Sequence, residues 1–194
     1  MRQLSIDIET YSDADIKKAG LYRYVQSPAF EVLLLAYSVD GAPVCVVDLA
    51  QGETLPQDLV YMLLDPEVTK RAYNAAFEWF CLSKHLGLSE VIMLDWLPQW
   101  RCTMLHGLYC GYTAGLGATG EALGLPQDKR KLGTGANLIR TFCVPCKPSA
   151  SNGHRTRTLP QHEPEKWQLF KNYCAQDVVT EMEIERLLAA FPVP

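Results

Sequence analysis

Leu4-Ser5-Ile6-Asp7-Ile8-Glu9-Thr10 is a short apolar run that two carboxylates interrupt. Ile6 and Ile8 are β-branched and are typical of a buried strand. Side chains two residues apart lie on the same face of a strand, so we expect Asp7 and Glu9 to point the same way. Two carboxylates beside a core lose hydration and repel each other, and a divalent cation such as Mg²⁺ or Mn²⁺ removes that cost. A strand end whose acids simply reach water is the alternative.

The composition is that of a single α/β domain in a reducing compartment. The chain has 194 residues, of which 48% are hydrophobic and 21% are charged, values that are ordinary for one globular domain. Membrane helices need about 18 consecutive apolar residues, and the sequence has no such run and no signal-peptide pattern at its start. The seven scattered cysteines are odd in number and do not suggest a disulfide framework. We therefore expect a cytoplasmic protein without membrane partners.

The charge of the chain is unevenly distributed. The formal net charge is −4, which argues against a general polyanion binder. The segment from Pro126 to Pro160 nevertheless carries +6 and leaves −10 for the remainder. Its basic residues are Lys129, Arg130, Lys131, Arg140, Lys147, Arg155 and Arg157. Such a basic band on an acidic body suggests one face that meets phosphates, although chance clustering in a solvated loop would look the same.

Apolar patterns and turn residues predict strands that alternate with helices, which indicates an α/β sheet. Strands are expected at residues 4–10, 31–40, 44–49 and 68–73. Helices are expected at residues 15–20, 55–64, 75–86, 102–112, 116–123, 135–143 and 163–190, each bounded by capping residues, glycine or proline. Residues 144–160 are rich in Pro, Ser, Asn, Gly and Arg, and predict a long mobile loop.

The last predicted helix carries an acid where a core residue is expected. Its apolar stripe at helical spacing includes Trp167, Phe170 and Ile184. Asp177 falls on this stripe, four residues after Tyr173, so the two side chains should be neighbours. A carboxylate in such a position needs a partner. That partner is either a cation or, more simply, the tyrosine hydroxyl or a nearby arginine.

A further acid lies at the junction between the strand at 68–73 and the helix that follows. Asn74 occupies the N-cap position and Glu78 the first turns of that helix, and these two residues alone could be an ordinary capping pair. In an α/β sheet, however, this junction, the first strand and the last helix can converge at the carboxyl ends of the strands. Four acids at one point are unstable without cations, so the physical interpretation is two-metal chemistry on a phosphodiester.

The acids belong to three short motifs, which follow one another along the chain: Asp7-x-Glu9, Asn74-x-x-x-Glu78 and Tyr173-x-x-x-Asp177. In this order they resemble the DEDD 3′–5′ exonuclease superfamily with a tyrosine in the third motif (DEDDy). The chain is similar to the proofreading exonuclease domain of phage-type family A (polymerase I-like) DNA polymerases over nearly its whole length, as one exonuclease domain at residues 1–194. The resemblance implies a ribonuclease H-like α/β fold, with a mixed five-stranded sheet and helices on both faces.

The resemblance also implies two Mg²⁺ or Mn²⁺ ions and a role for each acid. Asp7 would bridge both ions, Glu9 and Asp177 would complete the first site, and Glu78 would hold the second directly or through water. The family usually has Asp in place of Glu78, so the second ion is expected to sit differently or to bind more weakly. Tyr173 would orient the attacking water, since a phenol with a pKa of about 10 is a poor base at neutral pH.

The substrate implied by the resemblance is the 3′ end of single-stranded or frayed DNA, cut to nucleoside 5′-monophosphates. The resemblance also implies a polymerase module as partner and a bacterial or phage-infected cell as the setting. Aromatic side chains that stack on bases and basic side chains that contact the backbone would bind it. The candidates are Thr10, Tyr11, Asn74, Phe77, Arg155 and Arg157. Tyr11 and Phe77 could instead be core residues.

Three other interpretations remain open. Cys143-x-x-Cys146 with His154 and His162 offers a zinc-binding set, although the two histidines are too far apart for a usual zinc finger. A catalytically dead nucleic-acid-binding or polymerase-docking domain is a second possibility, against which the complete set of acids argues. An RNA-trimming exonuclease of the same superfamily is the third, because discrimination depends on how the 2′-OH is received.

Overall fold

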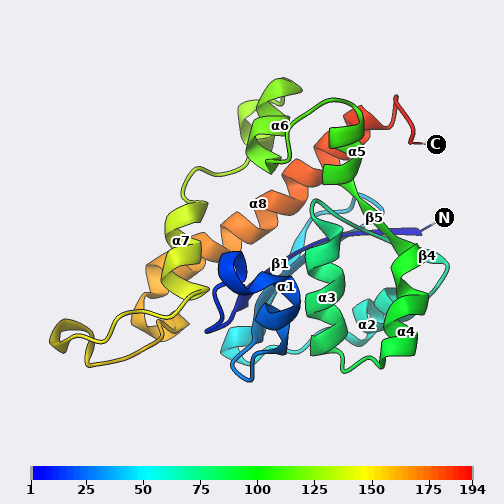
Figure 1. Ribbon diagram of the computed structural model, residues 1–194. Helices are drawn as coiled ribbons and strands as arrows, with labels where there is room; N and C mark the ends of the chain where they lie inside the picture. The colour runs from blue at the N-terminus through cyan, green and yellow to red at the C-terminus, as the bar shows by residue number, and fades with distance from the viewer. Residues whose placement is uncertain (1, 194) are drawn as a thin grey trace.

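The computed structural model describes residues 2–193, whose strands form one mixed five-stranded sheet (Figure 1). The strands are β1 (Arg2–Tyr11), β2 (Glu31–Val39), β3 (Cys45–Asp48), β4 (Val68–Ala72) and β5 (Trp100–Cys102). Their order in the sheet is β3-β2-β1-β4-β5. The pairs β1–β2 and β2–β3 are antiparallel, and the pairs β1–β4 and β4–β5 are parallel. The predicted mixed five-stranded sheet is confirmed.

Helices cover both faces of the sheet, as predicted. The α-helices are α1 (Ile16–Gln26), α2 (Gln57–Leu64), α3 (Ala75–His85), α4 (Glu90–Trp96), α5 (Thr103–Tyr109), α6 (Leu116–Ala122), α7 (Gly135–Phe142) and α8 (Pro164–Leu188). Short 3₁₀ helices cover Leu49–Gln51, Leu97–Gln99, Gln127–Lys129, Ala150–Asn152 and Pro160–His162. The described residues contain no helix that is long and apolar enough to cross a membrane.

The central strand β1 divides its side chains between two cores. Leu4, Ile6 and Ile8 are buried in the core that α1, α2, α3 and α4 cover. The alternating position Tyr11 belongs to the core on the other face, under α7 and α8. Burial of each large aliphatic side chain contributes about 1.5–3 kcal/mol, so β1 is anchored from both sides. Asp7 and Glu9 occupy the α8 face because they alternate with the buried isoleucines.

The long helix α8 crosses the face of the sheet and is fixed by its aromatic residues. Trp167, Phe170 and Tyr173 are buried beneath it, and Phe142 of α7 stacks on Phe170 with ring centroids 5.5 Å apart. Phe170 stacks in turn on Tyr173 at 6.1 Å. Aromatic contacts of this kind add about 0.5–1.5 kcal/mol per pair. They hold the middle of α8 against the carboxyl end of β1.

The structure differs from the predicted elements in three places. The helix predicted at residues 15–20 does end at Gly20, whose φ of +78° is not helical, but helical turns resume beyond it and carry α1 on to Gln26, which was not predicted. The helix α4 and the strand β5 were not predicted, because β5 has only three residues and α4 has a continuous apolar run at residues 91–94 without helical spacing. The segment 144–160, predicted as a mobile loop, projects from the molecule (Figure 1) and is tied by the hydrogen bond from Cys146 N to Thr156 O at 2.8 Å.

Candidate active site

A cleft of about 720 Å³ lies where β1 ends, between α1, α3, α7 and α8. It brings together acids from the first strand, the third helix and the last helix. The sequence-predicted residues that line it are Asp7, Glu9, Thr10, Phe77, Glu78, Tyr173 and Asp177. Segments more than 160 residues apart along the sequence therefore contribute to one concave surface, at the edge of the sheet where α/β proteins place their ligands.

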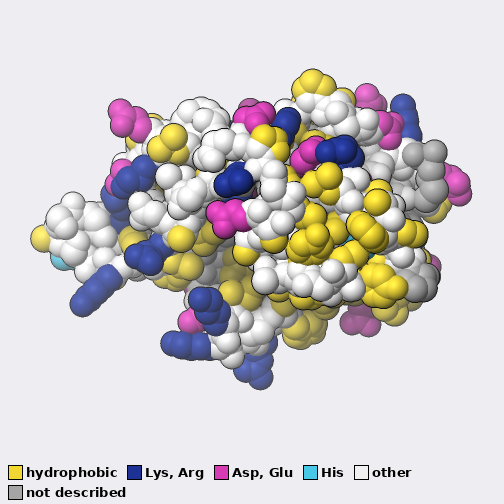
Figure 2. Space-filling view, turned by 90° about the horizontal axis from the view of Figure 1, so that it is seen from above, with side chains coloured by type: hydrophobic (Ala, Val, Ile, Leu, Met, Phe, Trp, Pro, Cys, Tyr) yellow, Lys and Arg dark blue, Asp and Glu magenta, His cyan; other side chains and the backbone are white. Residues whose placement is uncertain are grey.

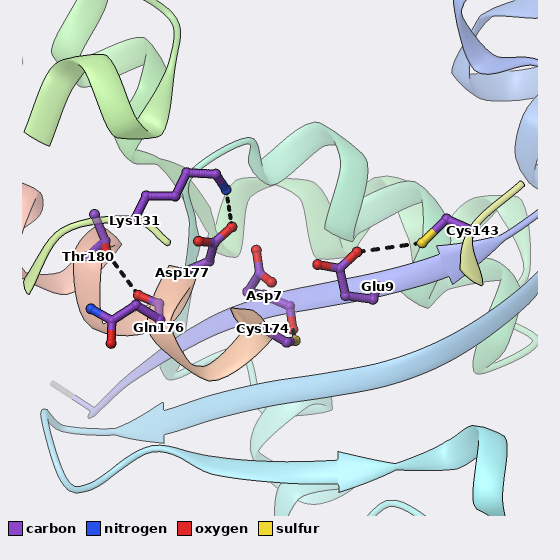
Figure 3. A network of polar contacts seen from close by, with 8 residues as sticks. All are labelled: Asp7, Glu9, Lys131, Cys143, Cys174, Gln176, Asp177 and Thr180. Carbon is purple, nitrogen blue, oxygen red and sulfur yellow. Dashed lines mark hydrogen bonds and ion pairs between the residues drawn. The ribbon is translucent and has the colours of Figure 1, made fainter. Parts of the chain in front are cut away.

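β1 positions the first two acids. Asp7 and Glu9 both project toward α8 in Figure 3, as their alternation with Ile6 and Ile8 requires. The Glu9 side chain is buried, and the thiol of Cys143 lies 3.8 Å from its Oε2. A register shift in the pairing with β2 follows Glu9. Such bulges re-aim the side chains beside them, and here the shift lies at the mouth of the cleft.

The helix α3 carries the third acid into the same cleft. It begins at Ala75, directly after β4 and a two-residue connection, and Glu78 lies in its first turn. Glu78 is 4% exposed. Carboxylates near a helix N-terminus gain from the helix dipole, which offsets part of the cost of burial.

The helix α8 supplies Tyr173 and Asp177, one turn apart on the face that meets the sheet. The Tyr173 ring lies against Gly135, the first residue of α7. A Cβ on Gly135 would come within 2.2 Å of the ring carbon Cε2. Only glycine permits this packing, so the start of α7 fixes where the phenol points.

Burial dominates the electrostatics of the acid cluster. Burial raises the pKa of Asp7 well above its usual range, and the nearby Asp177 raises it further. The pKa values of Glu9 and Glu78 are raised for the same reason, with Asp7 as the neighbouring charge. Asp7 Oδ2, Glu78 Oε2 and Asp177 Oδ1 have no hydrogen-bond partner among residues 2–193. The cluster therefore requires a counter-charge, either protons or a cation.

The donor set suits a hard divalent cation, because carboxylate oxygens are the preferred ligands of Mg²⁺ and Mn²⁺. The orphaned oxygens of Asp7, Glu78 and Asp177 are the atoms that such an ion would use. Within the described residues, however, no three His, Cys, Asp or Glu side chains already stand in a metal-ligating arrangement. Lys131 forms an ion pair with Asp177 (Figure 3), so this acid already has a positive partner.

Two basic residues near the acids were not among the predicted site residues. Arg140, in the last turn of α7, lines the cleft, and Lys131 contacts Asp177 from the connection before α7. Both lie in the basic band of the sequence, which was the available signal. Figure 2 shows Lys and Arg side chains over the half of the molecule that contains α1 and α7, and a broad hydrophobic area toward α5. Most of the basic side chains on this face thus lie on the half that holds the cleft, while a few lie on the other half.

Two of the predicted substrate contacts lie in the cleft. Thr10 Oγ1 is hydrogen-bonded to the Tyr24 hydroxyl at 2.8 Å, so Thr10 is held in place from α1. Phe77 is half-buried, and its ring lies 6.3 Å from that of Tyr24. Phe77 therefore combines core packing with a face on the cleft.

The other four predicted contacts lie outside the cleft. The ring of Tyr11 is buried in the α8-side core, and the Arg157 guanidinium lies 3.9 Å from its centroid. Arg157 also forms an ion pair with Glu31 at 2.6 Å. Asn74 lines a separate hollow beside α5, and its side chain makes no capping bond within the described chain. Arg155 remains in the projecting loop and does not line the cleft either. Alternation and loop folding turn these four side chains away from the cleft, and their contact with the substrate stays a prediction.

The cysteines and histidines of the zinc interpretation do not gather. The Cys143 thiol faces Glu9, and the Cys146 thiol donates to the Arg155 carbonyl at 3.3 Å. His162 Nδ1 accepts a hydrogen bond from Leu159 N at 2.9 Å. Residues 2–193 thus offer no zinc-binding set.

The sheet order, the mixed strand directions and the helices on both faces define a ribonuclease H-like α/β protein with an acidic cleft at the end of β1. Two solved structures share this fold with a TM-score of 0.50 each. One is the apo form of a nuclease, 17% identical, covering 97% of this chain and 72% of that one. The other is a chain from the structure of the yeast NOT1 MIF4G domain co-crystallized with CAF1, which is 11% identical, the match covering 99% of this chain and 81% of that one.

A DNA polymerase of Bacillus phage SP02 is 49% identical to this chain over 192 residues. The alignment covers 98% of this chain and 28% of the polymerase, so the chain corresponds to just over a quarter of its relative. No protein-family model matches the sequence. The chain is thus homologous to one region of a phage DNA polymerase, and its fold is shared with a nuclease.

Proposed function

We propose that this chain is a metal-dependent 3′–5′ exonuclease, which hydrolyses phosphodiester bonds at the 3′ end of single-stranded or frayed DNA and releases nucleoside 5′-monophosphates. The observation that carries the proposal is the convergence of the half-buried Asp7, the buried Glu9, Glu78 and Asp177, and Tyr173 in one cleft. Buried acids with raised pKa values and orphaned oxygens mark functional sites more often than structural ones. A cleft open to solvent lets a substrate reach them.

In this proposal Asp7, Glu9 and Asp177 would hold one divalent cation, and Asp7 together with Glu78 would hold a second. The cations, when bound, would activate a water molecule and neutralise charge on the scissile phosphate. Burial and the nearby Asp177 raise the pKa of Tyr173 above its ordinary value. Its phenol therefore stays protonated at neutral pH, where it can orient a water or a phosphate oxygen by donating a hydrogen bond, but cannot act as a base.

The homology to a phage DNA polymerase favours DNA as the substrate and proofreading as the setting. A polymerase extends a 3′ end, and a nuclease that removes residues from that end could correct its errors. We therefore propose a polymerase module as the partner of this chain. The half-buried Phe77 and the exposed Arg140 are suited to a frayed base and to the backbone, respectively.

The proposal is tested with a 5′-labelled single-stranded DNA in the presence of Mg²⁺ or Mn²⁺. We expect stepwise shortening from the 3′ end with release of 5′-monophosphates, and loss of this activity by roughly a thousandfold in Asp7→Ala. Asp95→Ala, which removes an exposed acid of α4, is the matched control and should keep the parental rate. Circular dichroism of both variants checks that the fold survives.

Two outcomes would redirect the assignment. No cleavage by the parent chain on DNA or RNA would favour a non-catalytic nucleic-acid-binding domain. Faster cleavage of an RNA of the same sequence would favour an RNA-trimming enzyme, since the two substrates differ chiefly at the 2′-OH.

A further inference from the structure

Lys131 reaches the acid cluster, although the proposed chemistry assigns it no role. Its Nζ forms an ion pair with Asp177 Oδ2 (Figure 3) and lies 4.5 Å from the centroid of the Tyr173 ring. The side chain is only 29% exposed. The ammonium therefore stands against two of the residues that the proposed function uses.

The surroundings of Lys131 hold it in this position. Gln176 Nε2 of α8 donates to the Asp128 carbonyl at 3.0 Å, which ties the connection before α7 to the helix that carries Asp177. The methylene stem passes α6, where a Cβ on Gly117 would lie 3.6 Å from the Lys131 Cδ. Neighbours on two helices thus direct this lysine inward, unlike a lysine that swings freely in solvent.

A divalent cation at Asp177 would have to contend with this ammonium. Lys131 engages Oδ2, whereas Oδ1 has no partner among residues 2–193. A cation on this carboxylate either displaces the ammonium or binds beside a positive charge in a poorly hydrated site, where charges interact strongly. In both cases the lysine lowers the affinity for the cation.

We propose that Lys131 is a built-in counter-ion of Asp177, which competes with the divalent cation for this carboxylate and so regulates how tightly the site binds metal. The inference rests on the proposed function, because it concerns the same site. Without metal, the ammonium provides the positive charge that the buried Asp177 needs. When metal binds, the ammonium leaves Asp177, and the flexible stem allows it to turn toward solvent.

The test measures Mn²⁺ binding to the metal-stripped chain at pH 8 by calorimetry, without nucleic acid. We expect Lys131→Gln to bind Mn²⁺ about tenfold more tightly than the parent, since one positive charge next to the cation is removed. Lys129→Gln removes the same charge from the same segment but not from Asp177, and should stay within about twofold of the parent. An unchanged affinity in Lys131→Gln would overturn the inference.

A double-mutant cycle shows whether the effect passes through Asp177. Adding Lys131→Gln to Asp177→Asn should give no gain in affinity, and a gain that persists there would count against the competition. A parent chain that does not bind Mn²⁺ at all would instead overturn the proposed function. Melting temperatures give a second measurement: Lys131→Gln should melt below the parent in EDTA, and this deficit should vanish at saturating Mn²⁺. A deficit that is equal under both conditions would indicate a merely structural lysine.

Discussion

Asp177 and Glu181 lie one turn apart on α8, and both are buried acids, yet the two regions around them differ. Asp177 borders the open cleft, where Lys131, Asp7 and Tyr173 surround it. Glu181 does not line the cleft, and its Oε1 accepts a hydrogen bond from the Thr103 hydroxyl of α5. Its Oε2 has no partner within residues 2–193.

The difference shows what access to solvent adds to a buried carboxylate. Burial raises the pKa of Glu181 to about 7, with Thr103 and Arg71 opposing the shift. In the closed region only a proton can neutralise the buried carboxylate, so the burial of Glu181 simply lowers the stability of the fold. In the open region a cation or a substrate can enter. The unfavourable free energy of the buried carboxylate is then relieved by binding and so favours it.

The largest expected effect separates the two acids by activity. Asp177→Asn should lower the rate of 3′-end cleavage by roughly a thousandfold, because it removes a proposed ligand of the metal. Glu181→Gln, one turn away, should stay within about threefold of the parent. Single-turnover rates on a labelled oligonucleotide make the comparison. Equal losses of rate in both variants would mean that Glu181 also belongs to the active site, and that the two regions do not differ in function.

The second prediction concerns stability and pH in the closed region. The folded pKa of Glu181, about 7, lies above the usual 4.5, so the fold binds a proton that the unfolded chain releases. Glu181 therefore contributes full stability below pH 4.5, and this is lost as pH rises through 7. Glu181→Gln removes the loss, and its stability relative to the parent should improve by about 2–3 kcal/mol between pH 5 and pH 8.

Urea denaturation of the parent and Glu181→Gln in EDTA, at both pH values, measures this change. The acids of the cleft titrate in both proteins, so their contribution largely cancels in the difference; Glu181 is the smallest of the causes that act on the pKa values of Asp7 and Glu78. A difference that does not vary with pH would show that Glu181 is charged throughout and is better solvated than its burial suggests.

Much of the fold could be predicted from the sequence, because most of its strands and helices have local sequence patterns. The alternation of Asp7 and Glu9 with isoleucines and the four-residue spacing of Tyr173 and Asp177 are properties of single elements. They sufficed to predict which acids meet. The strand β5 was not predicted because three residues show no period and its place depends on pairing with β4, and α4 was not predicted because its apolar run at residues 91–94 lacks helical spacing.

The residues that contact the acids could not be predicted, because these are tertiary contacts between segments far apart in the sequence. Lys131 and Asp177 are 46 residues apart, and no local sequence pattern around either residue predicts their contact. Gly135 could be recognised as a helix start, but its contact with the Tyr173 ring depends on how α7 meets α8. Likewise, nothing near Arg157 in the sequence indicated that it pairs with Glu31 and lies over the ring of Tyr11.

The smallest expected effect tests whether the open region receives a polyanion. Arg140 lines the cleft, whereas Arg157 is paired with Glu31. Each phosphate contact on a single strand contributes about 0.7 to the log–log slope of affinity against salt concentration. Binding of an oligonucleotide in EDTA, which prevents cleavage, should show a slope shallower by about 0.7 for Arg140→Gln and an unchanged slope for Arg157→Gln. If Arg157→Gln flattens the slope instead, the nucleic acid follows the projecting loop rather than the cleft beside Asp177.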